Sequence, residues 1–262
     1  MNCLEKYRST LLKKTNPGLR KLIVEPEEDA VHDFRVGVKR LSALYYFLHE
    51  IEPTLSTKKM LKPYRSLFKT IGKIRDGHIA TYLIQELHEG DVKDSEILLK
   101  AVKSRVRKDF QLFQNKLQPD VQNSITIPTI AATGISEGTI LRRKQYVLEN
   151  LWSQFANHQE RESSERWHKK RILLKRYHHT LDAFQFCPGH TLDEKELKQI
   201  RMLEQLLGDW HDRVTTIQYV QSLQGLKNQA ERLIAKMENQ DRILLESAKI
   251  YLNKYLKWHE NQ

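Results

Sequence analysis

The sequence contains an internal repeat, and this repeat limits the folds that the chain can adopt. The ten residues His32 to Leu41, HDFRVGVKRL, recur 136 positions later as HKKRILLKRY, from His168 to Tyr177. A repeat of this length predicts two copies of one structural unit. The chain has 262 residues, enough for two units of about 130 residues, each with its own core.

The repeat preserves cations while most residues around them change. The retained pattern is His-x-x-Arg-x-x-x-Lys-Arg, and the same offset returns Gly72 and Asp76 as Gly208 and Asp212. A duplicated chain that keeps these cations indicates where a ligand binds. The two sets are His32, Arg35, Lys39 and Arg40 in the first copy, and His168, Arg171, Lys175 and Arg176 in the second.

A second row of cations follows in each copy at helical spacing. Like charges three or four residues apart on a helix repel each other, so a bound anion is the simplest compensation. This row consists of Lys59, Lys62, Arg65 and Lys69, matched by Lys195, Lys198, Arg201 and Gln205. Near the start of each copy, Lys6 and Arg8 match Arg142 and Lys144, and a further run of cations over 100–108 retains only one match.

Helical periodicity dominates the chain, with few Gly and Pro residues and little alternating pattern. Long helices with short connections predict an all-α fold of antiparallel bundles. The predicted domains are a first repeat at 1–118, a linker at 119–136 and a second repeat at 137–262. The predicted helices are 2–15, 26–51, 55–71, 73–89 and 92–118, then 137–158, 164–186, 191–207, 209–224 and 226–259.

Two glycines leave the helix boundaries open. Gly72 and Gly208 either break a helix or kink it, with Asp76 and Asp212 then capping the following segment.

The cations and the apolar residues of each motif fall on opposite helix faces. At about 100° per residue, His32, Arg35 and Lys39 lie opposite the stripe of Phe34, Val38, Leu41, Tyr45 and Leu48. In the second copy His168, Arg171 and Lys175 lie opposite Leu174, Tyr177, Leu181 and Phe184. A merely solvated face would mix charge signs and would not keep each cation in place after duplication.

The charge balance supports an anionic ligand. Lys and Arg number 44 against 33 Asp and Glu, for a net charge of +11. Arg matches phosphate oxygens bidentately and Lys supplies an adaptable point charge, so the mixed lining suits an extended ligand with many phosphates. The sequence has no Gly-rich phosphate loop. Its cationic faces also lack the aromatic platforms that single-stranded nucleic acid favours.

The remaining sequence features concern the compartment. Cys3 and Cys187 are isolated and lack metal-ligand spacing, which suits a reducing compartment. The N-terminus lacks an apolar signal region, and no stretch approaches the roughly 18 apolar residues of a membrane span. We therefore expect a cytoplasmic protein with no membrane partner.

These motifs together resemble the CHAD domain, the conserved histidine α-helical domain. The resemblance rests on VHDFRVGVKRL, IGKIRD at 71–76, WHKKRILLKRY and LGDWHD at 207–212, and it extends over essentially the whole chain. It implies two four-helix-bundle subdomains related by pseudo-twofold symmetry with a basic channel between them. It also implies binding of inorganic polyphosphate, in some members at polyphosphate granules.

The resemblance assigns polyphosphate contacts to both cationic motifs, and one position departs from the family pattern. Repeat one has Arg75 before Asp76, whereas repeat two has His211 before Asp212. We interpret the two aspartates as structural, because a carboxylate would repel the ligand. The full predicted site comprises the eight motif cations together with Lys6, Arg8, Lys62, Arg65, Arg75, Arg142, Lys144, Lys198 and Arg201.

Two other function classes remain as alternatives. Glu165-x-x-His168 and Asp29-x-x-His32 have the spacing of carboxylate-bridged metal sites, but first-turn capping also explains both acids. His32-Asp33 and His211-Asp212 spell the dipeptide of metal phosphohydrolases at unmatched repeat positions. A non-specific nucleic-acid binder is the second alternative. The sequence therefore predicts a non-catalytic polyphosphate-binding protein that needs no cofactor or metal.

Overall fold

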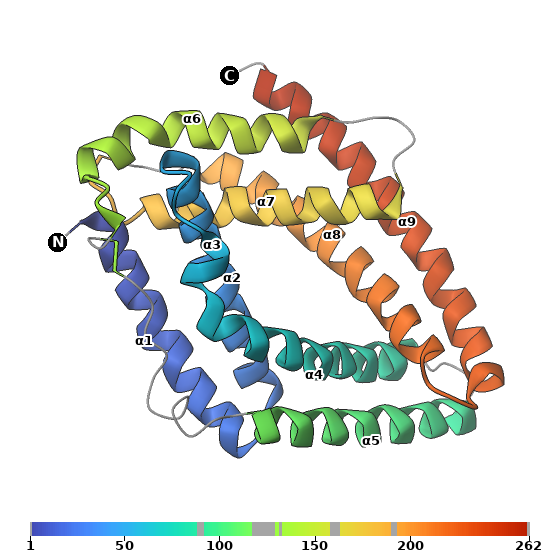
Figure 1. Ribbon diagram of the computed structural model, residues 1–262. Coiled ribbons are helices and arrows are strands. Elements are labelled where there is room, and N and C mark those ends of the chain that lie inside the picture. Colours follow the sequence, from blue (N-terminus) through green and yellow to red (C-terminus); the bar gives the residue numbers. More distant parts are fainter. Residues whose placement is uncertain are drawn as a thin grey trace. The chain divides into compact units, whose positions relative to one another are not determined.

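The computed structural model is helical, which confirms the all-α prediction. It describes residues 2–87, 92–116, 129–130, 133–157, 163–189 and 193–260, and these ranges contain no β-strand. The helices are α1 (Cys3–Val24), α2 (Glu28–Ile51), α3 (Thr57–Met60), α4 (Lys62–Leu87), α5 (Val92–Lys116), α6 (Glu137–Ala156), α7 (Ser164–Phe184), α8 (Glu194–Gln221) and α9 (Lys227–Glu260) (Figure 1). Among the residues described, no helix is long and apolar enough to span a membrane.

The chain forms two compact units that do not follow the sequence repeats. Unit 1 comprises Met1–Phe68 and Gln118–Arg201, and unit 2 comprises Lys69–Leu117 and Met202–Gln262. Each unit therefore draws on both predicted domains, 1–118 and 137–262. The physical reason is the length of α4 and α8, each of which begins in unit 1 and continues into unit 2. The predicted linker 119–136 lies outside the described residues, apart from 129–130 and 133–136.

Four helix predictions need correction. The predicted helix 55–71 is divided at Leu61, so that Lys59 lies in α3 and Lys62 begins α4. α4 and α8 run without a break through Gly72 and Gly208, so Asp76 and Asp212 lie inside helices and do not cap them. α1 extends to Val24, well beyond the predicted end near residue 15, and contains Pro17. Proline removes one backbone hydrogen bond, but Leu19 and Leu22 beyond it are buried and hold the following turns in the core.

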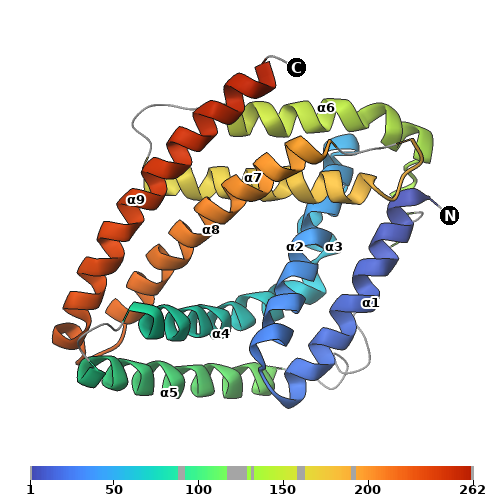
Figure 2. The ribbon, with the colours of Figure 1, turned by 180° about the vertical axis from the view of Figure 1, so that it is seen from behind.

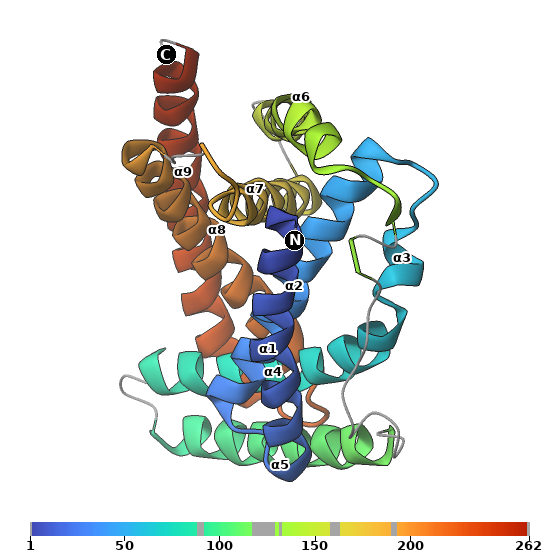
Figure 3. The ribbon, with the colours of Figure 1, turned by 90° about the vertical axis from the view of Figure 1, so that its left-hand side faces the viewer.

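Unit 1 is built around α2 and α7. α1 packs along α2, α2 contacts α7, and α6 lies beside α7 (Figure 3). The predicted apolar stripes are confirmed, because every residue assigned to them is buried. α1 and α2 approach closely at Gly37, where an added Cβ atom would overlap the Thr15 hydroxyl.

Unit 1 also contains a disulfide, so the interpretation of its cysteines as isolated was wrong. Cys3 at the start of α1 is bonded to Cys187, which follows α7, with a Cα–Cα distance of 4.9 Å. Both residues are buried. A spacing of 184 residues gives no local pattern, so the pairing could not be inferred from the sequence.

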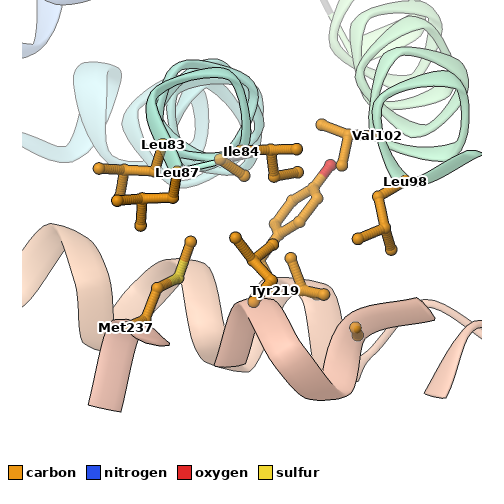
Figure 4. Packing of buried hydrophobic residues seen from close by; sticks show 11 residues of the cluster. Leu83, Ile84, Leu87, Leu98, Val102, Tyr219 and Met237 are labelled. Carbon is orange, nitrogen blue, oxygen red and sulfur yellow. The ribbon is translucent and has the colours of Figure 1, made fainter. Parts of the chain in front are cut away.

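Unit 2 has its own apolar core, formed by the later parts of α4 and α8 together with α5 and α9 (Figure 2). Leu83, Ile84 and Leu87 from α4 meet Tyr219 from α8 and Met237 from α9 (Figure 4). Leu98 and Val102 add the apolar face of α5 to the same cluster. The opposite face of α5 is consequently left at the surface.

Candidate anion-binding surface

The two His-x-x-Arg-x-x-x-Lys motifs occupy equivalent faces of α2 and α7. On α2, His32 is exposed and Arg35 and Lys39 are half-buried, while Phe34 and Val38 of the same turns are buried. The prediction that the cations lie opposite the core stripe is therefore confirmed.

α7 repeats this arrangement. It begins after Ser163, whose hydroxyl accepts a hydrogen bond from the Arg166 backbone N–H. His168, Arg171 and Lys175 are half-buried along its surface, and Leu174 lies in the core. Because α2 and α7 are in contact, both motifs belong to unit 1.

Arg35 connects α2 to the first part of α4. Its Nη1 donates a hydrogen bond to the backbone oxygen of Phe68 at 3.3 Å, and its guanidinium lies 4.5 Å from the centroid of the Phe68 ring. A cation over an aromatic face is stabilised without losing its charge. This contact brings the α4 row, with Lys62 and Arg65 exposed, beside α2.

The first part of α8 is held against α7 in a comparable way. The Tyr177 hydroxyl donates a hydrogen bond to Glu196 Oε1 at 2.8 Å. Lys198 and Arg201 follow Glu196 on α8, and both are exposed. Unit 1 thus brings the predicted cations of four helices into one compact unit.

Arg40 and Arg176 contact repeat-equivalent positions in the opposite copy. Arg40 Nη2 lies 3.7 Å from Asp182 Oδ2, and the Arg176 guanidinium lies 4.4 Å from the centroid of the Tyr46 ring. Arg176 is the counterpart of Arg40, and Asp182 is the counterpart of Tyr46, at the same offset of 136 positions. The contact of α2 with α7 therefore retains a pseudo-twofold pattern, although the two partners differ chemically.

Asp182 is a negative charge held within this contact. Burial alone would raise its pKa, but a hydrogen bond with His179 and the nearby charges of His178 and Arg40 outweigh that effect. The pKa of Asp182 is therefore lowered from its usual value. The carboxylate stays ionised and balances the charge of Arg40.

The predicted cations near the start of each copy divide by environment. Lys6 is exposed, and Arg142 is exposed while its Nη2 donates to Thr139 Oγ1 at 3.2 Å. Lys144 is half-buried over the Phe184 ring, and burial lowers the pKa of its ammonium group. Arg8 is buried in an ion pair with Glu5, so its assignment to the ligand site is corrected to a structural role.

Arg75, also predicted as a contact, is half-buried in α4 and belongs to unit 2. Its counterpart His211 is half-buried in α8 of the same unit, with its ring centroid 6.3 Å from that of Trp210.

His168 differs electrostatically from an isolated histidine. Burial, and then the positive charge of Arg171, lower the pKa of His168 below its usual value of about 6.5. The charged form of the imidazole is therefore disfavoured in the free protein.

The two acidic residues that the alternative metal site would use, Glu165 and Asp29, do not form such a site. Glu165 forms an ion pair with Lys169 at 2.8 Å, and Asp29 is exposed. In the ranges that the structure describes, no group of three His, Cys, Asp or Glu residues is arranged to hold a metal ion.

The sequence interpretation missed one buried cation with a structural role. Lys170 is 4% exposed and donates to the backbone oxygens of Phe155 and Asn157, each at 2.7 Å. Its ammonium group thereby caps the C-terminal end of α6. The equivalent position of the first repeat is the core residue Phe34. Comparing the two repeats therefore could not indicate that Lys170 caps a helix.

The CHAD domain family model matches residues 3–221, so the chain belongs to the CHAD domain family. The crystal structure of the CHAD domain from the plant Ricinus communis is 17% identical with a TM-score of 0.70, and the match covers 96% of this chain and 90% of that chain. PptA from Streptomyces chartreusis is 13% identical with a TM-score of 0.59, covering 97% and 98% respectively. At these identities the likeness concerns the fold. No curated protein matches the chain.

Proposed function

We propose that this protein binds inorganic polyphosphate without cleaving it, through the cations of unit 1. The supporting observation is the equivalence of α2 and α7, which contact each other and present the same cations opposite their buried stripes. We name the proposed contact set the unit 1 surface. It consists of His32, Arg35, Lys39, Lys62, Arg65, His168, Arg171, Lys175, Arg176, Lys198 and Arg201.

The chemistry of this set favours a ligand with many phosphates. Guanidinium groups fit phosphate oxygens bidentately, whereas ammonium groups follow a flexible chain as point charges. Cations contributed by four helices exceed what a single phosphate could neutralise. The resemblance to CHAD domains, which implied polyphosphate as the ligand, agrees with this charge arrangement.

Six predicted contacts are left out of the unit 1 surface. Arg75 belongs to unit 2, and the charges of two others are balanced internally. Arg8 is paired with Glu5, and Arg40 faces Asp182. Lys6, Arg142 and Lys144 are proposed to add long-range attraction.

The proposal includes the origin and location of the protein. The constant offset is explained by duplication of an ancestral helical unit, and the resemblance implies that each copy corresponds to a four-helix bundle. The resemblance also implies a place at polyphosphate granules, whereas the proposed cytoplasmic location rests on the N-terminal sequence and on the isolated cysteines. The Cys3–Cys187 disulfide is the observation that opposes a strongly reducing compartment.

The direct test compares Arg35→Ala and Arg171→Ala with the control Arg20→Ala. Arg20 is exposed on α1 of the same unit, outside both motifs, and removes the same charge. A charge-assisted contact contributes about 1.5–3 kcal/mol, so each motif variant should weaken polyphosphate binding by about 10-fold to 100-fold. The double variant should be weaker still, with Arg20→Ala close to the wild type.

Competition experiments separate this function from its alternative. Unlabelled polyphosphate should displace labelled polyphosphate at lower concentration than DNA or RNA at the same phosphate concentration and salt. A nucleic acid that competes equally well would favour the non-specific nucleic-acid binder. If Arg20→Ala and Arg35→Ala lost equal affinity for polyphosphate, binding would depend on net positive charge and not on positioned residues. That result would contradict the unit 1 surface.

A further inference from the structure

α5 in unit 2 carries a row of cations that the unit 1 surface does not include. We name Lys93, Lys100, Lys103, Arg107 and Lys108 the α5 stripe, and all five are exposed. At about 100° per residue, the first four fall within about 80° of one another. The face directly opposite contains Leu98, Val102 and Phe113, all buried. From Lys93 to Arg107 the stripe extends about 21 Å along the helix.

The protein's own packing does not use the α5 stripe. Arg105, on the same helix, shows what a structural cation does there. Its guanidinium lies 5.0 Å from the Tyr219 ring centroid, and its Nη1 donates to Ser222 Oγ at 2.6 Å. By contrast, no residue of the α5 stripe forms a hydrogen bond or ion pair within the described parts of the chain.

The α5 stripe is electrostatically unfavourable without a partner. Lys100, Lys103 and Arg107 are separated by three and four residues, a spacing at which like charges destabilise a helix. Glu96 is the single acid on this exposed face. A bound polyanion would relieve this repulsion.

Duplication does not explain the α5 stripe either. The α9 counterparts of Lys93, Lys103 and Arg107 are Gln229, Asn239 and Ile243, and only Lys100 has a cationic equivalent. The row is therefore a property of one copy and is separate from the repeated motif.

We propose that the α5 stripe is a second binding surface for linear polyphosphate, located entirely on unit 2. The choice of polyphosphate rests on the proposed function, and the composition of the face supports it. A protein partner would need aromatic or apolar anchors, and single-stranded nucleic acid would need stacking platforms. The stripe itself has neither. Val92, at the start of α5, is the exposed apolar residue nearest to it, about 60° from its centre, and is a single small aliphatic side chain, whereas Leu112 points about 140° away.

The test removes three charges from the α5 stripe and compares the result with a charge-matched control. The test variant is Lys100→Gln, Lys103→Gln and Arg107→Gln. The control is Lys227→Gln, Arg242→Gln and Lys254→Gln, three exposed cations of α9 in the same unit. Both triples are placed in Arg35→Ala/Arg171→Ala, in which binding by the unit 1 surface is weakened, so that unit 2 contributes a larger share of the remaining binding of long-chain polyphosphate. Circular dichroism checks that both variants remain helical.

We expect the α5 triple to weaken residual binding by about tenfold or more. Its log-log salt dependence should become shallower by about two, because each lost ionic contact removes up to about 0.7–0.9 of slope. The control triple should change affinity less than about threefold. Equal effects of the two triples, or no effect of the α5 triple, would overturn the α5 site.

The result is separable from the proposed function. If Arg35→Ala/Arg171→Ala binds like the wild type, the unit 1 surface fails, and the α5 triple is then tested in the wild-type background. Preferential displacement of polyphosphate from unit 2 by duplex DNA at equal phosphate concentration would instead overturn the choice of ligand for the α5 stripe.

Discussion

Individual arginines at equivalent repeat positions have unequal electrostatic environments. Arg40 faces the ionised carboxylate of Asp182, whereas Arg176 lies over the neutral ring of Tyr46. An aromatic ring orients a guanidinium group but leaves its charge available to a ligand. The duplication alone would give these two arginines the same role, and the structure separates them.

This difference predicts unequal salt dependence of polyphosphate binding. Arg176→Gln should lower the log-log slope by up to about 0.7–0.9, as expected for one lost ionic contact. Arg40→Gln should leave the slope nearly unchanged while lowering thermal stability, because it removes the partner of Asp182. Titrations at several salt concentrations measure both slopes, and an equal loss in the two variants would contradict the structural role of Arg40.

His168 predicts that polyphosphate binds more tightly as the pH falls. Its pKa is lowered in the free protein by burial and Arg171, and apposed phosphates would raise the pKa in the complex. Affinity should be constant above the bound-state pKa, rise as the pH falls through the interval down to the free-state pKa, and then level off. Calorimetry in buffers of different ionisation enthalpy measures the accompanying proton uptake. His168→Gln should take up fewer protons, and an unchanged uptake would assign the effect to other groups.

The sequence predicted which residues face the surface but not what they contact. Helical phase alone separated His32, Arg35 and Lys39 from the core, because side-chain direction follows the 3.6-residue period. The Arg8 pair with Glu5 spans only three residues, yet the burial of Arg8 depends on tertiary packing around α1. The contact of Arg40 with Asp182 joins distant segments and has no local signal.

At the scale of helices, glycine was the main source of error. Gly72 and Gly208 lie within continuous helices, because the cost of about 1 kcal/mol for a glycine is small beside the packing of a long helix. The sequence did not indicate why residue 37 is a glycine, because the equivalent position of the second repeat is Leu173 and the repeat therefore does not preserve a glycine there. In the structure it permits the close approach of α1 and α2.

Gly37→Ala should therefore destabilise the contact of α1 with α2. The new Cβ would overlap the Thr15 hydroxyl, which is held by a 2.8 Å hydrogen bond to the Leu11 backbone oxygen. Overpacking of this kind costs about 1–3 kcal/mol of unfolding free energy. In a Thr15→Ala background the same substitution should cost at least about 1 kcal/mol less, measured by chemical denaturation. Additive costs would mean that the two residues do not meet.

At the scale of the whole molecule, the repeats and the compact units differ. Sequence similarity reports equivalent positions, whereas compactness depends on which segments pack together. α4 and α8 each contribute to both units, so no boundary at the predicted linker could separate the molecule into its packed parts. The fold class was predictable from periodicity. The division of α4 and α8 between the two units, and the pairing of Cys3 with Cys187, were not predictable from the sequence.

The disulfide predicts a large effect of reduction on unit 1. Cross-links that close long loops typically contribute about 2–5 kcal/mol by restricting the unfolded chain. Cys3→Ser/Cys187→Ser should therefore melt at a lower temperature than the oxidised wild type and be insensitive to added reductant. The wild type should approach the melting temperature of this variant once reduced. A wild type that melts at the same temperature with and without reductant would contradict a stabilising cross-link.

The Cys3–Cys187 bond also changes the covalent topology of the molecule. While it is intact, the polypeptide from α1 to the end of α7 is a closed ring, with α8 and α9 attached as a tail. One backbone scission anywhere within the ring yields a single connected molecule whose fragments cannot diffuse apart. The same scission after reduction yields two polypeptides held only by packing. Proteolytic nicking inside the ring would thus leave the fragments covalently joined in an oxidising environment, whereas in a reducing one only packing would hold them together.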